Sequence, residues 1–261
     1  MTKFKKIIPA LCMLLISAVL MGTSTYAWFS MNTSVKATEM KVTAKSDAVF
    51  LQIINASDTF DATAQTSVKT NVAAKTVRPT NVYKTFNATA PEAFAGGKDF
   101  VFVSNYSKDP TDSTKAGEYT DVTADAKLLP TDENATKNVY TLISTYKIRL
   151  KPDTGAATAP GKLKVSGVAF HTDSATSGLQ QAVSVLIVCG NFSVVYKQTE
   201  TKGTFVASGD PALSADAFAN TTGEEVKVYV FFDGDNAACT TNNIALDDTF
   251  SVDVTFNCNK D

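Results

Sequence analysis

From Trp28 onward, apolar residues recur mainly at every second position, in runs rich in Val, Ile, Phe, Tyr and Thr. Clusters of Gly, Pro, Asn and Asp separate these runs. Alternation with period two predicts strands, and the clusters predict the turns between them. Ten strands are expected, over residues 37–44, 48–54, 81–86, 100–103, 138–150, 162–170, 182–189, 192–197, 225–232 and 249–257. So many strands in one chain predict two packed sheets.

The alternation of apolar residues with other residues is clearest in segments 225–232 and 249–257. In both, every even-numbered residue is Val or Phe. The odd-numbered residues of the second segment are all polar, and those of the first include Glu225 and Lys227. Each segment is therefore expected to have one core face and one wetter face.

Two local signals complete the expected secondary structure. Gly190 and Asn191 lie between two apolar runs, and both residue types tolerate positive φ, which predicts a tight hairpin. Residues 210–220 are expected to form one short helix, with Asp210 as its cap and Pro211 in its first turn. Because helices between strands are otherwise lacking, a doubly wound parallel sheet is excluded. The predicted fold is an all-β, antiparallel two-sheet sandwich.

Residues 1–27 have the three zones of a secretory signal peptide: a basic start, an apolar run over 7–21 and a small, polar stretch over 22–27. Thr25 and Ala27 occupy the positions where a signal peptidase requires small side chains, so we predict cleavage between Ala27 and Trp28. The alternative is an uncleaved anchor. Its apolar run would span about 22 Å as a helix, short of the roughly 30 Å hydrocarbon core. Membrane contact is thus expected only through an uncleaved signal.

The exported chain, residues 28–261, is expected to be a single sandwich domain with an N-terminal extension over 28–36. Charged residues make up 19% of the whole chain, below the roughly 25% usual for soluble domains. Without Lys3, Lys5 and Lys6, 21 basic residues remain against 26 acidic ones, a balance of −5. Such a chain lacks the basic field that nucleic-acid binding needs, so no nucleic-acid partner is expected.

Candidate chemistry is sparse. His171 is the single histidine, and most hydrolytic metal sites and nucleophile triads need well-placed histidines. Removal of the signal leaves Cys189, Cys239 and Cys258, which allow either one disulfide with a free thiol or three reduced thiols. Their spacings do not resemble a zinc site. No catalytic residue and no cofactor is predicted.

Asp233 and Asp235, in the sequence Asp-Gly-Asp-Asn, are weak candidates for calcium ligands because hard cations prefer carboxylate and amide oxygens. No bidentate Glu follows at loop spacing, so a plain turn is favoured. Asp247 and Asp248 keep the calcium alternative open, because a neighbouring loop could add their oxygens.

Aromatic residues gather in the first half of the chain and allow two interpretations. They either belong to the core or form a platform for sugars, which would make the chain a monomeric surface adhesin or a carbohydrate-binding module. The residues in question are Tyr83, Phe86, Phe94, Phe100, Phe102, Tyr106 and Tyr119.

Two motifs carry a family resemblance. The segment 22–30 (GTSTYAWFS), followed by 38–42 (TEMKV), resembles the N-terminal segment of Gram-positive exported proteins of the TasA and camelysin type, whose signals a SipW-type peptidase cleaves. The segment 228–239 (VYVFFDGDNAAC), closed by the strand 249–256, resembles the terminal hairpin of related exported proteins. The resemblance implies a jelly-roll sandwich, secreted and assembled into fibres at the cell surface or in a biofilm matrix.

Camelysin-like proteins have been labelled metalloproteases, but a zincin needs two histidines one helical turn apart. This chain has one, so we predict that it is not an enzyme. In TasA-type fibres, the segment freed by cleavage completes a sheet of the neighbouring subunit. Here that segment carries Trp28, Phe29, Met31 and Val35. Each would stabilise a buried site by roughly 1.5–3 kcal/mol. The sequence therefore predicts self-association by N-terminal strand donation.

Overall fold

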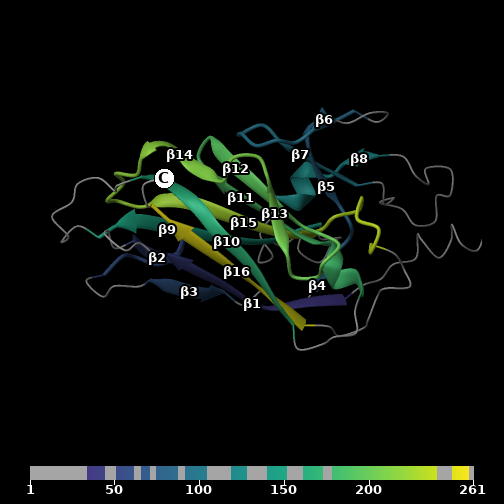
Figure 1. Ribbon diagram of the computed structural model, residues 1–261, viewed down its shortest axis with the longest axis horizontal. Coiled ribbons are helices and arrows are strands. Elements are labelled where there is room, and N and C mark those ends of the chain that lie inside the picture. The colour runs from purple at the N-terminus through teal and green to yellow at the C-terminus, as the bar shows by residue number, and fades with distance from the viewer. Residues whose placement is uncertain are drawn as a thin grey trace, which may run out of the picture.

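A computed structural model describes residues 34–44, 51–61, 66–70, 75–87, 92–104, 119–127, 140–151, 161–172, 178–239 and 249–258. The described residues form an all-β sandwich of several mostly antiparallel sheets, which confirms the predicted fold class (Figure 1). The predicted signal segment 1–27, its cleavage site and residues 28–33 lie outside the described residues.

Sheet I contains the first and the last strand of the chain. Its order is β14 (Ala212–Ala217), β10 (Lys162–Thr172), β16 (Thr249–Asn257), β1 (Ser34–Ala44) and β3 (Ser67–Thr70). The short β4 (Lys75–Thr76) also pairs with β1. β1 runs parallel to β16, with Lys36 opposite Thr249 and Ala44 opposite Phe256, whereas the other described ladders between strands are antiparallel (Figure 1). This parallel pair departs from the purely antiparallel arrangement expected from the sequence.

Sheet II is antiparallel throughout. Its order is β13 (Phe205–Ser208), β12 (Phe192–Gln198), β11 (Val183–Cys189), β15 (Glu224–Phe232), β9 (Leu142–Leu150) and β2 (Leu51–Asn55). The 3-10 helix η4 (Gly178–Ala182) leads into β11. The predicted hairpin is confirmed, because Cys189 pairs with Phe192 around a two-residue loop in which Gly190 has a φ of +54°.

Sheet III is small and was not expected from the sequence as a separate layer. It consists of β6 (Glu92–Ala93), β5 (Asn81–Thr85), β7 (Val101–Ser104) and β8 (Thr120–Asp121), followed by the short helix α2 (Thr123–Ala126). These strands lie together at the upper right of Figure 1, away from β1 and β3.

Two apolar cores result. The large core lies between sheets I and II and includes Val42, Ile148, Val185, Val228 and Phe256. The small core lies on the other side of sheet II, under sheet III, and includes Phe102, Leu186 and Tyr229. Sheet II is therefore covered on both faces along part of its length.

Each of the ten predicted strands overlaps an observed strand. The alternation predicted for 249–257 is confirmed, because every even-numbered residue from Phe250 to Phe256 is buried in the large core. For 225–232 the predicted wetter face is wrong over its second half. Tyr229 is 4% exposed and Phe231 1% exposed, because sheet III covers this part of sheet II.

The predicted helix over 210–220 is wrong, since most of it forms β14. The Asp210 carboxylate does accept a hydrogen bond from the Ala212 N–H, at 2.9 Å, but this contact closes a local turn before the strand. Asp favours such turns as well as helix caps, so the sequence signal was ambiguous. Tertiary contacts decide the outcome, because Leu213 and Phe218 are buried in the large core and the Ser214 hydroxyl accepts from the Leu163 N–H of β10 at 2.9 Å.

Candidate functional site

The Asp-Gly-Asp-Asn turn directly follows β15, and its first carboxylate is buried. The Asp233 side chain is 6% exposed. Its Oδ2 lies 2.7 Å from the Lys197 ammonium, and its Oδ1 accepts from the Asp235 N–H at 3.1 Å. Asp233 also donates its own N–H to the Ala182 carbonyl at 2.8 Å. Both carboxylate oxygens therefore face donors of the same chain.

The second carboxylate of the turn reaches sheet III. Its Oδ2 accepts a hydrogen bond from the Tyr83 hydroxyl at 2.8 Å, and the Asp235 N–H donates to the Asn81 amide oxygen at 3.2 Å. Burial, followed by the hydrogen bond to Asp235, raises the pKa of Tyr83 well above its usual range, so the phenol stays a donor. Within the described residues, no group of three or more His, Cys, Asp and Glu side chains is placed to hold a metal ion. Asp247 and Asp248 lie outside the described residues.

These contacts favour the turn interpretation over calcium binding and give the turn a structural task. The Thr80 N–H donates to the Phe232 carbonyl at 2.9 Å, and the Thr80 hydroxyl donates to the Val103 carbonyl at 3.1 Å. Together with the Asp235 contacts, these bonds join the end of β15 to β5 and β7. We call the contacts of Thr80, Tyr83, Asp233 and Asp235 the latch. The sequence pointed to the two aspartates but not to Lys197, and it singled out Tyr83 only as an aromatic residue of the core or of a sugar platform.

His171 lies near the end of β10, on the outer face of sheet I. Its Nε2 is 3.3 Å from Asp253 Oδ2, and its side chain is 58% exposed. The strand predicted over 162–170 ends one residue before His171, whereas the observed β10 continues to Thr172. A contact of this kind at the surface contributes little to stability.

Cys189, Cys239 and Cys258 are free and buried, so the structure follows the reduced alternative. Burial raises the pKa of each thiol to about 12. Thiols that keep their proton are poor nucleophiles and poor metal ligands. All three belong to the large core and act there as small apolar side chains.

The aromatic set does not form one platform. Phe94, Phe100 and Phe102 are buried in the small core, and Phe100 packs edge-on against Phe102 at 5.7 Å. Tyr83 and Tyr119 are half-buried and lie 6.4 Å apart between ring centroids. Phe86 is 42% exposed, and Tyr106 lies outside the described residues. The rings thus belong mainly to the packing of sheet III.

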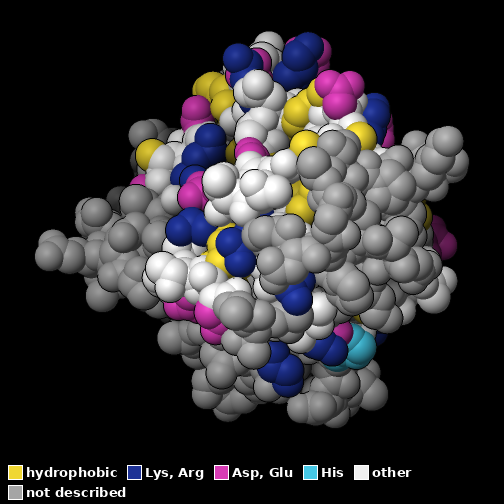
Figure 2. Space-filling view, turned by 90° about the vertical axis from the view of Figure 1, so that its left-hand side faces the viewer, with side chains coloured by type: hydrophobic (Ala, Val, Ile, Leu, Met, Phe, Trp, Pro, Cys, Tyr) yellow, Lys and Arg dark blue, Asp and Glu magenta, His cyan; other side chains and the backbone are white. Residues whose placement is uncertain are grey.

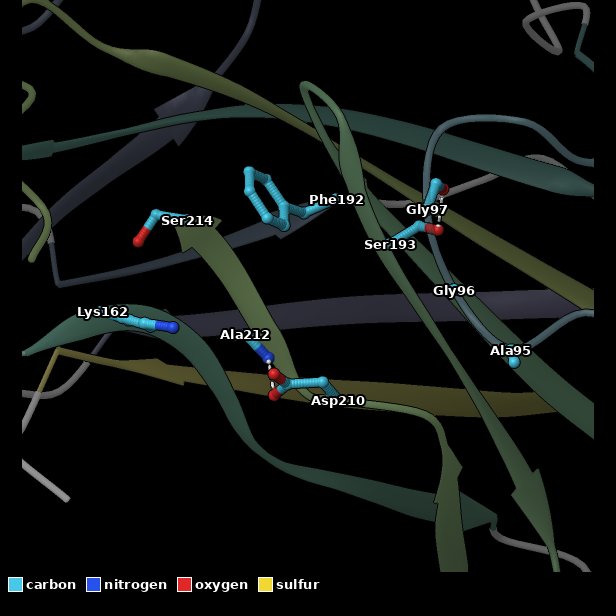
Figure 3. A pocket seen from close by; sticks show the side chains of 9 residues that line it. All are labelled: Ala95, Gly96, Gly97, Lys162, Phe192, Ser193, Asp210, Ala212 and Ser214. Atoms are coloured by element: carbon cyan, nitrogen blue, oxygen red, sulfur yellow. Dashed lines mark hydrogen bonds between the residues drawn. The ribbon is translucent and has the colours of Figure 1, made fainter. Parts of the chain in front are cut away.

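A hollow of about 140 Å³ lies where the three sheets meet (Figure 3). Its polar side chains are partly committed to backbone groups. The Ser193 hydroxyl donates to the Gly97 carbonyl, and Asp210 accepts from Ala212. Because these groups are engaged and the volume leaves little room for a ligand, the hollow is a packing gap between the sheets, which we call the seam. Its lining residues are Ala95, Gly96, Gly97, Lys162, Phe192, Ser193, Asp210, Ala212 and Ser214.

Of the four residues expected to drive assembly, three precede β1 and one, Val35, lies within it. Trp28, Phe29 and Met31 lie outside the described residues. The backbone of Val35 pairs with Lys75 of β4, and the neighbouring Lys36 pairs with Thr249 of β16. Residues 34–36, expected to be part of an N-terminal extension, therefore belong to sheet I.

The distribution of charge on the surface gives little further indication of function. On the face shown in Figure 2, Lys and Arg side chains are interspersed with Asp and Glu, without a broad field of one sign. None of the helices in the described ranges is both long enough and apolar enough to cross a membrane.

Comparison with known proteins adds no relative: no protein-family model, no curated protein and no solved structure matches the chain. The resemblance of the two sequence motifs to the TasA and camelysin type stays a prediction.

Proposed function

We propose that the chain is an exported structural protein of a bacterial cell surface or biofilm matrix, and that its subunits join into fibres by N-terminal strand donation. The observation that carries the proposal is the open edge of sheet II at β13. Among the described strands, β13 pairs only with β12. Its Val206 side chain is 56% exposed, and Phe86 is the other exposed large apolar side chain among the described residues. An uncharged open edge is a template for pairing with another chain.

β13 differs from the other sheet edges in its chemistry. Its four residues, Phe205–Ser208, include no charge. At the edges of sheet I, β3 carries Lys69 and β14 carries Asp216, and charged side chains discourage strand addition. β2, the other edge of sheet II, has four fully buried residues out of five. β13 is therefore the acceptor that we assign.

The donor is the segment that precedes β1. Because Ser34 and Val35 already pair with β4, the donated strand consists of residues 28–33. Six extended residues cover about 20 Å, which is enough to pair with the whole of a four-residue strand. Main-chain hydrogen bonds would hold the joint, and Trp28, Phe29 and Met31 would bury apolar surface against the neighbour.

Electron microscopy and sedimentation of three variants test this function. A chain that begins at residue 34 keeps β1 but lacks the donor. Val206→Lys places a charge on the acceptor edge, and Val206→Thr is its matched control, since it keeps the β-branched shape. We expect fibres from the naturally processed chain and from Val206→Thr, and monomers from the other two.

Fibres of equal length and number from the chain that begins at residue 34 would overturn strand donation. A processed chain that stays monomeric under all conditions would instead favour the alternative, a surface adhesin or carbohydrate-binding module. Fibres from Val206→Lys that also need residues 28–33 would leave the donor in place and move the acceptor away from β13.

A further inference from the structure

The outer face of sheet II is only partly covered by sheet III. On this face, three cross-strand pairs of β15 and β9 follow one another: Tyr229 with Ile143, Lys227 with Thr145, and Glu225 with Lys147. Tyr229 and Ile143 are each 4% exposed, because they belong to the small core. The next two pairs are half-buried or exposed. Sheet III therefore covers the first pair and leaves the second and third pairs partly accessible to solvent.

A hollow of about 420 Å³ lies at this step. The two strands line it with Ile143, Thr145, Glu225, Lys227 and Tyr229. Lys127, directly after α2, closes it from the side of sheet III. A volume of this size is in the range of small-molecule sites. Three of its seven lining residues, Ala56, Ile143 and Tyr229, are apolar, and the other four bring polar groups together.

The two lysines of the hollow differ in their partners. The Lys227 ammonium lies 3.1 Å from Glu225. Lys127 forms no ion pair with any residue in the described part of the chain, and its ammonium lies 4.3 Å from the centroid of the Phe100 ring. Of the two ammonium groups, only that of Lys227 therefore lies within ion-pair distance of a carboxylate, while Asp121 acts on Lys127 from farther away.

The pKa of Lys127 agrees with this geometry. Partial burial lowers it, Asp121 raises it, and the nearby Lys227 lowers it further. The Asp121 carboxylate is itself engaged, because it accepts the Thr123 N–H at 2.8 Å. An anion in the hollow would reduce the repulsion between the two lysines and give Lys127 the charge-assisted hydrogen bond that it lacks.

We propose that this hollow binds the anionic group of an acidic sugar, a carboxylate or a phosphate, between Lys127 and Lys227. Thr145 and Glu225, which also line the hollow, would supply a hydroxyl and a carboxylate for the sugar hydroxyls, and Tyr229 and Ile143 would contact its apolar face. This site shares no residue with the donor segment or with β13. Binding and fibre assembly are measured separately, so the failure of one is distinguishable from the failure of the other.

Titration of the naturally processed chain with glucuronate, glucose 6-phosphate and neutral glucose tests the site. Calorimetry gives the affinity, and NMR shift changes of the Lys127, Thr145 and Lys227 amides locate the ligand. We expect glucuronate or glucose 6-phosphate to bind at millimolar concentration, more weakly as salt is added, while glucose does not bind. The acid that binds more tightly identifies the anionic group.

Three variants complete the experiment. Lys127→Gln and Lys227→Gln keep a polar side chain but remove the charge, and each is expected to weaken binding about tenfold to a hundredfold. Lys162→Gln, in the seam of Figure 3, is the matched control and is expected to bind like the parent chain. The proposal fails if neither acid binds or if glucose binds equally well. It also fails if Lys162→Gln loses binding while Lys127→Gln keeps it.

Discussion

The two cores on opposite faces of sheet II are built from different side chains. The large core consists mostly of Val, Leu and Ile, with aromatic residues making up a fifth of its buried members. In the small core, aromatic residues make up half, namely Phe94, Phe100, Phe102, Tyr140, Tyr229 and Phe231. The large core lies between two six-stranded sheets, whereas sheet III has four strands of two to five residues.

This difference follows from the size of the covering layer. Branched aliphatic residues suffice where long strands place many of them face to face. Sheet III offers few inward positions, so each must bury more area, and an aromatic ring buries about 150–250 Å². Phe102 packs edge-on against Phe231, with ring centroids 5.9 Å apart, and Phe100 packs edge-on against Tyr229 at 6.2 Å. A small sheet thus forms a stable layer through a few large side chains and the latch at its end.

The largest expected effect comes from Phe102→Ala. Phe102 is fully buried at the centre of the small core, so its loss is expected to lower the free energy of unfolding of sheet III by about 3–5 kcal/mol. Phe256→Ala, at a fully buried position of the large core, is the matched variant. Hydrogen exchange with mass spectrometry measures both. We expect Phe102→Ala to lower protection in 81–104 and leave 162–172 of sheet I nearly unchanged, whereas Phe256→Ala lowers protection in both segments. Equal losses everywhere in both variants would show one cooperative core.

A smaller effect is expected at Gly209, where the connection from sheet II to sheet I passes close to sheet III. Gly209 has a φ of +102°, and an added Cβ would lie 2.4 Å from the Ala95 carbonyl oxygen. Gly203 has a φ of +83° and open space around it. Both Ala variants carry the strain of positive φ, about 1–3 kcal/mol. We expect Gly209→Ala to lose measurably more stability in urea titration, because it also separates the layers. Equal losses would mean that the close approach is unimportant.

At neutral pH the smallest effect concerns the thiols, which report on the large core alone. Cys189, Cys239 and Cys258 have pKa values raised to about 12 from the usual 9.0. Between pH 9 and pH 12, the unfolded thiols lose their protons and the folded ones keep theirs. The contribution of the thiols to stability is therefore complete below pH 9 and decreases as pH rises towards 12.

Thiol labelling at neutral pH, followed as a function of time, checks this prediction. We expect labelling of the folded chain to need opening of the large core, so Phe256→Ala accelerates it. Phe102→Ala should leave the labelling rate close to that of the parent chain. Rapid labelling of the intact parent chain would contradict the buried position of the thiols, and a denaturation series between pH 7 and pH 10 tests the pH dependence directly.

The sequence by itself determined the features that depend on neighbours along the chain. The ten main strands and the Gly190 hairpin follow from alternation and from residues that accept positive φ. Asp233 and Asp235 were likewise recognisable as a turn. Their partners were not, because Tyr83 is 152 residues away from Asp235 along the chain and no local pattern links them.

Only the tertiary structure decided which surfaces are covered. β15 alternates like β16 in the sequence, yet Tyr229 and Phe231 are buried because a distant segment folds over them as sheet III. Directly before β14, Asp210 and Pro211 predicted the start of a helix. The segment that follows forms a strand instead, because it pairs with β10 and buries Leu213. The parallel pairing of β1 with β16 joins the first and last strands of the chain. Periodicity reports which face of a strand is apolar, but the free energy that selects its neighbour comes from contacts between segments far apart in sequence.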